Sequence, residues 1–280
     1  MNKIFASAIV IASLLVTQAK AQVTMPQPSP TQTFSQDFGM GIIKIVYSRP
    51  SIKGRNLFGE GTELAPLGKV WRTGANSATK ITFTDNVIIG GKILDTGSYV
   101  IYTKPMKDQW EIIINKGTAN WGTDGYKESD DVVHTLVPSM KMKESVETFT
   151  MQIANIKAES CELHLMWGNT AVAVPITTNI KDRLRTQIEK ALNGEKKPYS
   201  QAANFYYEWD KNYDKALENI NKAIEGNPKG FWLYLTKAKI KRDMGDKDGA
   251  KRNAEKTIEI ATEEKNEDYV RMAKELISKL

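Results

Sequence analysis

The sequence predicts a mainly β N-terminal domain, an antiparallel β-sandwich or barrel, followed by an all-α domain of helical hairpins. Apolar and polar residues alternate with a period of two over much of residues 33–177, which is typical of strands. In residues 178–280 the apolar residues recur every three or four positions, which is typical of amphipathic helices. A chain of 280 residues is long enough for two such domains.

The first 21 residues predict a secretory signal peptide. Lys3 supplies the positive charge, Ile4–Val16 is a short apolar stretch, and Ala19-Lys20-Ala21 fits a small-x-small cleavage site, so cleavage is expected after Ala21. The alternative is an uncleaved membrane anchor. No cysteine follows the apolar stretch, so we do not expect a lipoprotein. The expected location is periplasmic or secreted, with no membrane span after cleavage.

Three prolines within residues 22–32 predict a flexible leader. About eight to ten strands are then expected between residues 33 and 177. The clearest strand patterns lie at Ile43–Tyr47, Thr79–Thr84, Val87–Ile89, Lys92–Leu94, Tyr99–Thr103, Trp110–Asn115, Val146–Ile153, Cys161–Trp167 and Ala171–Ile176. Gly90-Gly91, between the third and fourth of these, predicts a two-residue hairpin turn.

Six helices are expected in the C-terminal domain, the first ended by Gly194. They are predicted at Ile180–Leu192, Pro198–Trp209, Asp214–Glu225, Phe231–Met244, Asp248–Ala261 and Asp268–Leu280. Ala216 and Ile220 recur 34 residues later as Ala250 and Ala254. This period resembles the tetratricopeptide repeat (TPR), which implies a module that holds a peptide or partner protein. The helices could instead buttress the β domain; in either case the hairpins must stack on each other and on the first helix.

Charge and cysteine content narrow the function classes. Without the signal peptide, 37 basic residues face 33 acidic ones, a net charge of +4, and the two signs are interspersed. That distribution favours a solvated helical surface over a nucleic-acid interface. Cys161 is the only cysteine, so no disulfide forms within the chain, and we expect this side chain to be a small buried hydrophobe.

Several short sequence motifs of the β region resemble those of a known family. They are Tyr-Ser-Arg-Pro-Ser at 47–51, Gly-Lys-Val-Trp-Arg-Thr-Gly-Ala-Asn at 68–76, Trp-Gly at 121–122 and Leu-Met-Trp at 165–167. Together they resemble the secreted bacterial family catalogued as domain of unknown function 2911 (DUF2911), over residues 34–175. The resemblance implies secretion and a β-rich domain, and it carries no agreed activity.

The candidate ligand-binding residues lie in or near the first two of these motifs. They are Tyr47, Arg49, Arg55, Trp71, Arg72 and Asn76. Arginine forks bind carboxylate or phosphate, an asparagine amide orients a polar ligand, and the two aromatic rings could stack against a sugar or ring. One hypothesis is therefore an anion or carbohydrate pocket at one end of the sandwich. The alternative is that the arginines bind backbone carbonyls and acidic side chains and so anchor the long loop 51–69.

The remaining polar residues predict no specific chemistry. His164 alternates with a buried face and is expected at the surface, and His134 is expected either exposed or in a strand pair. The acidic run from Asp124 to Asp131 is expected to be a solvated loop. Trp110, Trp121 and Trp167 are expected in core or rim packing. No metal-ligand spacing, cofactor fingerprint or catalytic motif is present.

The leading hypothesis is therefore a non-enzymatic binding or assembly protein, with a protein or peptide partner held by the helices. The alternative is an envelope enzyme or binding domain for an anionic or sugar ligand in the β domain.

Overall fold

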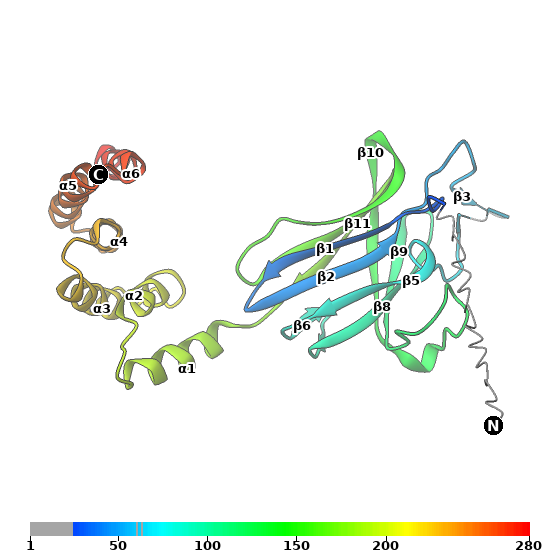
Figure 1. Ribbon diagram of the computed structural model, residues 1–280, viewed down its shortest axis with the longest axis horizontal. Coiled ribbons are helices and arrows are strands. Elements are labelled where there is room, and N and C mark those ends of the chain that lie inside the picture. The colour runs from blue at the N-terminus through cyan, green and yellow to red at the C-terminus, as the bar shows by residue number, and fades with distance from the viewer. Residues whose placement is uncertain (1–24, 60, 63) are drawn as a thin grey trace, which may run out of the picture.

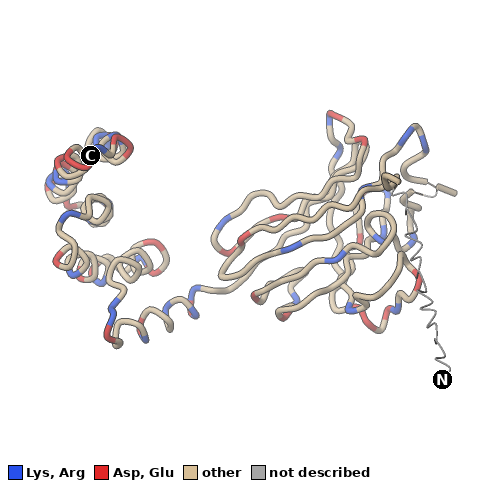
Figure 2. The backbone as a smooth tube through the Cα atoms, in the orientation of Figure 1, with Lys and Arg blue, Asp and Glu red and all other residues tan. Residues whose placement is uncertain are grey.

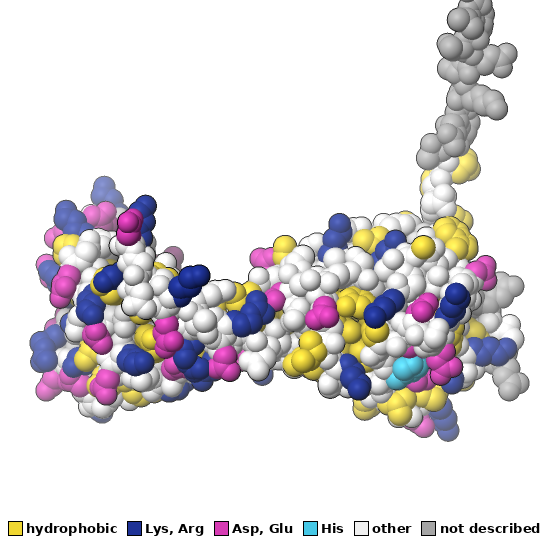
Figure 3. Space-filling model, turned by 90° about the horizontal axis from the view of Figure 1, so that it is seen from below, with side chains coloured by type: hydrophobic (Ala, Val, Ile, Leu, Met, Phe, Trp, Pro, Cys, Tyr) yellow, Lys and Arg dark blue, Asp and Glu magenta, His cyan; other side chains and the backbone are white. Residues whose placement is uncertain are grey.

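The computed structural model describes residues 25–59, 61–62 and 64–280, so the predicted signal peptide lies outside the described residues. A β-sheet lobe is followed by an arc of helices, and helix α1 (Lys181–Leu192) connects the two (Figure 1). The space-filling view shows a narrower waist between the lobes (Figure 3). The predicted fold class, a β domain followed by a helical domain, is confirmed.

The β lobe contains one antiparallel sheet of nine strands in the order β1-β2-β5-β8-β9-β10-β11-β6-β7. The strands are β1 (Thr31–Phe38), β2 (Gly41–Ser48), β5 (Ala75–Phe83), β6 (Val87–Ile89), β7 (Lys92–Leu94), β8 (Gly97–Pro105), β9 (Gln109–Asn115), β10 (Asp131–Ala154) and β11 (Ser160–Thr177). β3 (Phe58–Gly59) and β4 (Ala65–Pro66) form a separate short parallel pair.

The long strand β10 folds the sheet over on itself. Its first part, to Pro138, pairs with β9, and the part from Ser139 onward pairs with β11. The two layers then face each other across an apolar core in which Trp71 stacks on Trp167 of β11. Because β1 and β7 remain the edges of the described sheet, the lobe is an open sandwich rather than a closed barrel.

Most strand predictions are confirmed, with three corrections, one of which is that the strand predicted from Val146 begins at Asp131 as β10. Gly90-Gly91 forms the predicted hairpin, with Val87 opposite Leu94. Residues 31–32 of the predicted leader belong to β1, because they pair with β2. Residues 161–176, predicted as two strands, form the single strand β11; Gly168 (φ +55°) bends this strand without ending it.

The C-terminal domain contains the six predicted helices, each within a few residues of its expected ends. After α1 come α2 (Tyr199–Glu208), α3 (Tyr213–Gly226), α4 (Phe231–Asp243), α5 (Lys247–Glu263) and α6 (Glu267–Ser278). Side chains of Asn212 and Asp246, which are 34 residues apart, accept hydrogen bonds from the backbone N–H groups of Lys215 and Gly249. The repeat in the sequence is therefore also a repeat of helix caps.

The helices have cores of their own. Leu184, Ile188 and Leu192 of α1 pack against a cluster formed mainly by α2 and α3, as the stacking argument predicts. α4 is contacted by α2, α3, α5 and α6. Acidic and basic residues are interspersed along these helices (Figure 2). No helix in the described part of the chain is both long and apolar enough to cross a membrane.

Polar contacts fix the junction between the lobes. Glu159 Oε1 accepts hydrogen bonds from the backbone N–H groups of Ile180 (2.8 Å) and Lys181 (3.2 Å), which satisfies donors at the start of α1. Arg183 in the first turn of α1 forms an ion pair of 2.7 Å with Asp85. The start of α1 is thus held against the sheet, while its apolar residues face the other helices.

The Gly90-Gly91 turn offers a matched test of the fold. Both residues have positive φ (+56° and +74°), but a Cβ on Gly90 would lie 2.7 Å from Thr135 Cβ, and one on Gly91 would contact nothing within 4 Å. We expect Gly91→Ala to cost about 1–2 kcal/mol from backbone strain alone, and Gly90→Ala to cost more. Urea denaturation measures both, and equal losses would show that Thr135 does not confine the turn.

Candidate functional site

Two of the predicted ligand-binding residues are core aromatics. Trp71 is 4% exposed, stacks on Trp167 with 5.5 Å between ring centroids, and meets Trp110 and Phe149 edge-on. A ring this deeply buried has no free face, so Trp71 belongs to the core rather than to a stacking wall. Tyr47 is buried as well, and burial raises the pKa of its phenol. Its hydroxyl accepts a hydrogen bond from the Met151 backbone N–H (2.9 Å).

Arg49 and Arg55 bind the protein's own backbone. Arg49 Nε donates to the carbonyl of Phe149 (3.0 Å), and its Nη2 donates to Thr150 Oγ1 (2.7 Å). Arg55 closes its own loop by donating to the carbonyls of Ser51 (2.7 Å) and Ile52 (3.1 Å). These contacts match the anchoring alternative, because both guanidinium groups donate to nearby oxygens of the fold.

Arg72 and Asn76 lie together and are less completely engaged. Arg72 Nη1 donates to the backbone carbonyl of Asn76 at 3.2 Å. No carboxylate of the described residues lies within 4.0 Å of the Arg72 guanidinium. Gly122 covers this group so closely that a Cβ there would lie 2.9 Å from Arg72 Nη1. Half-buried Arg72 therefore carries a positive charge with no neighbouring carboxylate in the described part of the chain.

The turn that carries these residues has an unusual backbone. Thr73 (φ +58°), Gly74 (φ +152°) and Asn76 (φ +59°) all have positive φ, which is rare for a β-branched residue such as Thr73. The turn is held by Thr79 Oγ1, which donates to the Thr73 carbonyl at 2.6 Å. The Asn76 amide nitrogen donates to Ser48 Oγ at 3.3 Å. Strain held in place by such contacts is common at binding sites.

Two adjoining cavities meet at Asn76. One, of about 250 Å³, is lined by four of the predicted residues, Arg55, Trp71, Arg72 and Asn76, among others. The other, of about 500 Å³, is lined by Gln27, Thr31, Val46, Tyr47, Ser48, Asn76, Ser77, Ala78, Lys80 and Trp121. Arg49 lines neither cavity. The structure thus brings five of the six predicted residues to one region and places the sixth in a contact with β10.

Trp121 and Lys80 line the larger cavity and are absent from the sequence-based set. Trp121 was expected in core or rim packing, yet its side chain is 62% exposed. Ala78 and Lys80 are two positions apart in β5, so they share one face of the strand, and Asn76 lines the same cavity. That alternation could have identified Lys80. Trp121 belongs to the Trp-Gly motif at 121–122, but that motif does not indicate that the side chain lies at a cavity.

The loop that carries Trp121 is firmly anchored. Asp131 Oδ1 accepts from Asn115 Nδ2 (2.6 Å), and its Oδ2 accepts from the Tyr126 hydroxyl (2.7 Å). Asn120, next to Trp121, donates to the hydroxyl of Tyr102 at 3.1 Å. Tyr126 also packs on a small apolar cluster on the outer face of the sheet. Asp131 corrects the prediction of a solvated acidic run, because its side chain is only 2% exposed and starts β10 inside this network.

His134 completes this network. Its Nδ1 lies 2.8 Å from Glu111 Oε1, and its Nε2 lies 3.0 Å from Asp131 Oδ2. A ring with a carboxylate at each nitrogen is best satisfied as the doubly protonated cation. The hydrogen bond to Glu111 is the main reason why the pKa of His134 is raised. His134 is therefore both exposed and part of a strand pair. The other histidine, His164, was expected at the surface; it bonds Glu162 at 2.7 Å and is half-buried, with 21% of its side chain exposed.

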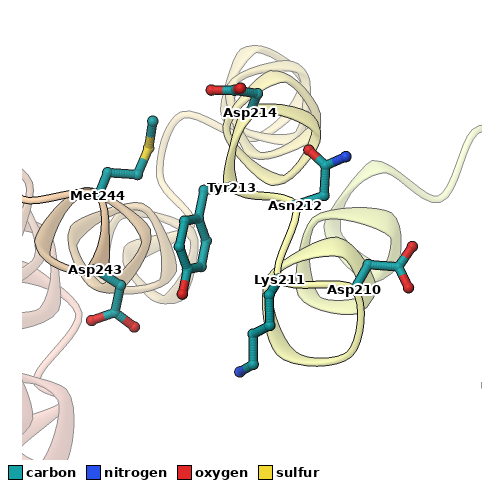
Figure 4. Close-up of a pocket in the computed structure, with 7 residues that line it drawn as sticks. All are labelled: Asp210, Lys211, Asn212, Tyr213, Asp214, Asp243 and Met244. Atoms are coloured by element: carbon teal, nitrogen blue, oxygen red, sulfur yellow. The ribbon is translucent and has the colours of Figure 1, made fainter.

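The helical domain has an open hollow of about 620 Å³ between the α2–α3 turn and the end of α4 (Figure 4). Two of its three acidic residues, Asp210 and Asp243, have basic partners, whereas Asp214 has none among the described residues. Asp210 bonds Arg185 at 2.7 Å, and Asp243 bonds Arg242 at 2.7 Å. Both contacts lower the pKa of the carboxyl group concerned. Arg185, Arg242 and the lining residue Lys211 balance the three carboxylates in charge, which makes the hollow a weak site for a charged ligand.

Fold and site together define a β-sandwich protein with an appended domain of helical hairpins and an open cavity in its β domain. A family model described as "Protein of unknown function (DUF2911)" matches residues 29–176, more than half of the chain. The chain belongs to this family. The match covers the sandwich and ends just before the helices, and the family description states no activity. No curated protein matches the chain at a significant level.

The contacts of Arg49 predict a difference in stability. Arg49→Ala removes two hydrogen bonds that join the end of β2 to β10, and we expect a loss of about 2 kcal/mol. Arg55→Ala is the matched control, because its exposed contacts lie within one loop, and we expect less than about 0.5 kcal/mol. Urea denaturation compares them, and a loss no larger for Arg49→Ala would contradict the anchoring role.

The raised pKa of His134 predicts a pH-dependent contribution to stability. Folding favours the protonated ring, so the contribution is complete below the unfolded pKa of about 6.5 and is lost as the pH rises through the folded pKa. We expect His134→Gln to cost about 0.5 kcal/mol at pH 5.5, since this exposed pair is screened, and less at pH 9.

Urea denaturation at several pH values measures the difference between wild type and His134→Gln. In a Glu111→Gln background the pH dependence of that difference should shrink. A wild-type advantage in the free energy of unfolding that stays constant or grows as the pH rises would contradict the raised pKa of His134.

Proposed function

We propose that this protein is an exported, non-enzymatic binding protein whose TPR-like helical domain docks a partner protein. The observation that carries the proposal is the separation of the helical hairpins from the sheet. A buttress would need an apolar helical face packed on the sandwich. In the described residues the helix next to the sheet is α1, and its Leu184, Ile188 and Leu192 pack on α2 and α3 instead. The outer surface of the hairpins is thus left for another molecule.

One stripe of α4 has the chemistry of a docking surface. Trp232 is 42% exposed, and Thr236 and Lys239 follow it on the same side of the helix, four and seven residues later. The neighbouring helices cover the other sides of α4. Exposed tryptophan is a frequent anchor of protein interfaces.

The positive charge of α4 favours an acidic partner. α4 carries Lys237, Lys239, Lys241 and Arg242 against the single acidic residue Asp243. Lys237 and Lys239 have no carboxylate of the described residues within 4.0 Å. The partner that fits the α4 stripe is therefore a protein segment with acidic side chains, for the lysines, and an apolar side chain that contacts Trp232.

Substitutions in the α4 stripe test this docking function. Trp232→Ala removes the anchor, and Lys239→Glu reverses the charge, so both should lower the yield of cross-linked partner at least tenfold. Mild cross-linking of the purified protein in envelope extract, followed by quantitative mass spectrometry, measures the yield of each cross-linked species.

Trp121→Ala is the matched control, because it removes an exposed tryptophan from the other domain. A species lost in both α4 variants and kept in this control supports the proposal. Equal yields of every cross-linked species in the wild type, the two α4 variants and the Trp121→Ala control would contradict the proposal.

A second function, binding of an anionic or sugar ligand by the β domain, is favoured by one specific observation. Within the described part of the chain, half-buried Arg72 has one side-chain hydrogen bond, to the Asn76 carbonyl, and no carboxylate within 4.0 Å, and it lines a cavity. A buried cation without a counter-charge is costly unless a ligand or solvent satisfies it. Arg72 and Asn76 retain their predicted role in this proposal, while Arg49 and Trp71 do not.

A further inference from the structure

Trp121 forms an exposed aromatic platform on a fixed loop. Its side chain is 62% exposed, whereas its neighbour Asn120 is bonded to Tyr102 and the following Gly122 packs on Arg72. The rest of the loop is held by the Asp131 network. Because the loop around Trp121 is already ordered, a ligand that covers the exposed ring does not have to order the loop, so Trp121 is prepared for binding.

The cavity beside Trp121 combines apolar surface with neutral hydrogen-bonding residues. Hydroxyl groups of Thr31, Ser48 and Ser77 and amide groups of Gln27 and Asn76 line it, with Val46 and Ala78 as apolar surface. Its volume of about 500 Å³ is within the range of small-molecule sites. Paired hydroxyl and amide groups suit the hydroxyl groups of a sugar ring, while the apolar C–H face of such a ring can cover an indole.

The charge of the region favours an acidic ligand. Lys80 lines the large cavity directly, and Arg72 lies behind Asn76 in the adjoining cavity. Neither cavity is lined by an aspartate or glutamate of the described residues. Lys80 and Arg72 have no described carboxylate within 4.0 Å. A carboxylate or phosphate in the larger cavity would therefore find Lys80 beside it and Arg55 and Arg72 in the adjoining cavity, with no described negative charge.

We propose that this cavity binds an acidic sugar, with the sugar ring on Trp121 and the carboxylate or phosphate directed at Lys80. Arg72 adds positive potential from behind Asn76. The inference rests on the ligand-binding function proposed for the β domain and names its ligand class and its orientation. One aromatic wall facing several hydroxyl and amide groups fits a sugar better than a nucleobase, which offers fewer hydroxyl partners.

Isothermal titration calorimetry of the purified protein tests this class. The probes are glucuronic acid and glucose 6-phosphate, with glucose, inorganic phosphate and adenosine monophosphate for comparison. We expect both acidic sugars to bind at least tenfold more tightly than glucose or phosphate. Trp121→Ala should weaken both acidic sugars at least tenfold, and Lys80→Gln should reduce their advantage over glucose about fivefold.

Trp232→Ala is the matched control and should leave every titration unchanged. Trp121 and Lys80 are exposed, so their variants should keep the wild-type melting temperature, which is measured alongside. Binding of glucose as tight as that of the acidic sugars would overturn the acidic class while supporting a ligand site in the β domain. Tighter binding of phosphate or adenosine monophosphate would likewise overturn the sugar class alone.

Two further outcomes complete the test. Acidic-sugar binding that survives Trp121→Ala and Lys80→Gln unchanged would overturn the proposed location. No heat with any probe, in protein that melts cooperatively, would overturn both the acidic-sugar inference and the ligand-binding function on which it rests. Neither result would affect the α4 docking function, which the Trp232→Ala and Lys239→Glu variants test separately.

Discussion

The stack of Trp71 on Trp167 joins the two layers of the sandwich and fixes where the neighbouring polar groups point. Trp71 forms an isolated antiparallel bridge with Thr103, so the chain is extended at this point. Successive side chains of an extended chain point to opposite sides. Burying the indole of Trp71 therefore turns Arg72 outward, beneath Gly122 and beside Asn76. The strained turn from Thr73 to Asn76 then returns the chain to β5, which places Lys80 on the same outer face.

Local periodicity was sufficient to predict the fold class and most element boundaries. The Gly90-Gly91 hairpin follows from adjacent residues, and the 34-residue spacing of Ala216 and Ala250 follows from comparing one segment of the chain with another; both appear in the structure. The unbroken course of β11 was harder to predict, because Gly168 is a bend there and glycine more often marks a turn. Alternation also identifies two faces of a strand without saying which side chains meet across the core.

The candidate site was only partly predictable for the same reason. Arginine type and spacing could not distinguish Arg49 from Arg72, since the partners of Arg49 lie 100 and 101 residues away on β10. Asp131 looked like the end of a solvated acidic run, but it is the first residue of β10, and its carboxylate accepts from Asn115 and Tyr126. Trp121 depends on that network for its position. Its proposed role follows from the three-dimensional anchoring of its loop, which the Trp-Gly motif at 121–122 does not reveal.

The two proposed binding surfaces are joined by few contacts. In the described residues the start of α1 meets the sheet through Glu159 and the Arg183–Asp85 pair, while the α4 stripe and Trp121 lie in different lobes. Coupling between distant sites needs an element with two arrangements that both sites bias. The Asp131 network holds the Trp121 loop against the sheet, and the α4 stripe belongs to the separately packed hairpins. This arrangement favours independent sites, in which the chain links a ligand of the β domain to a partner of the helices by its covalent continuity.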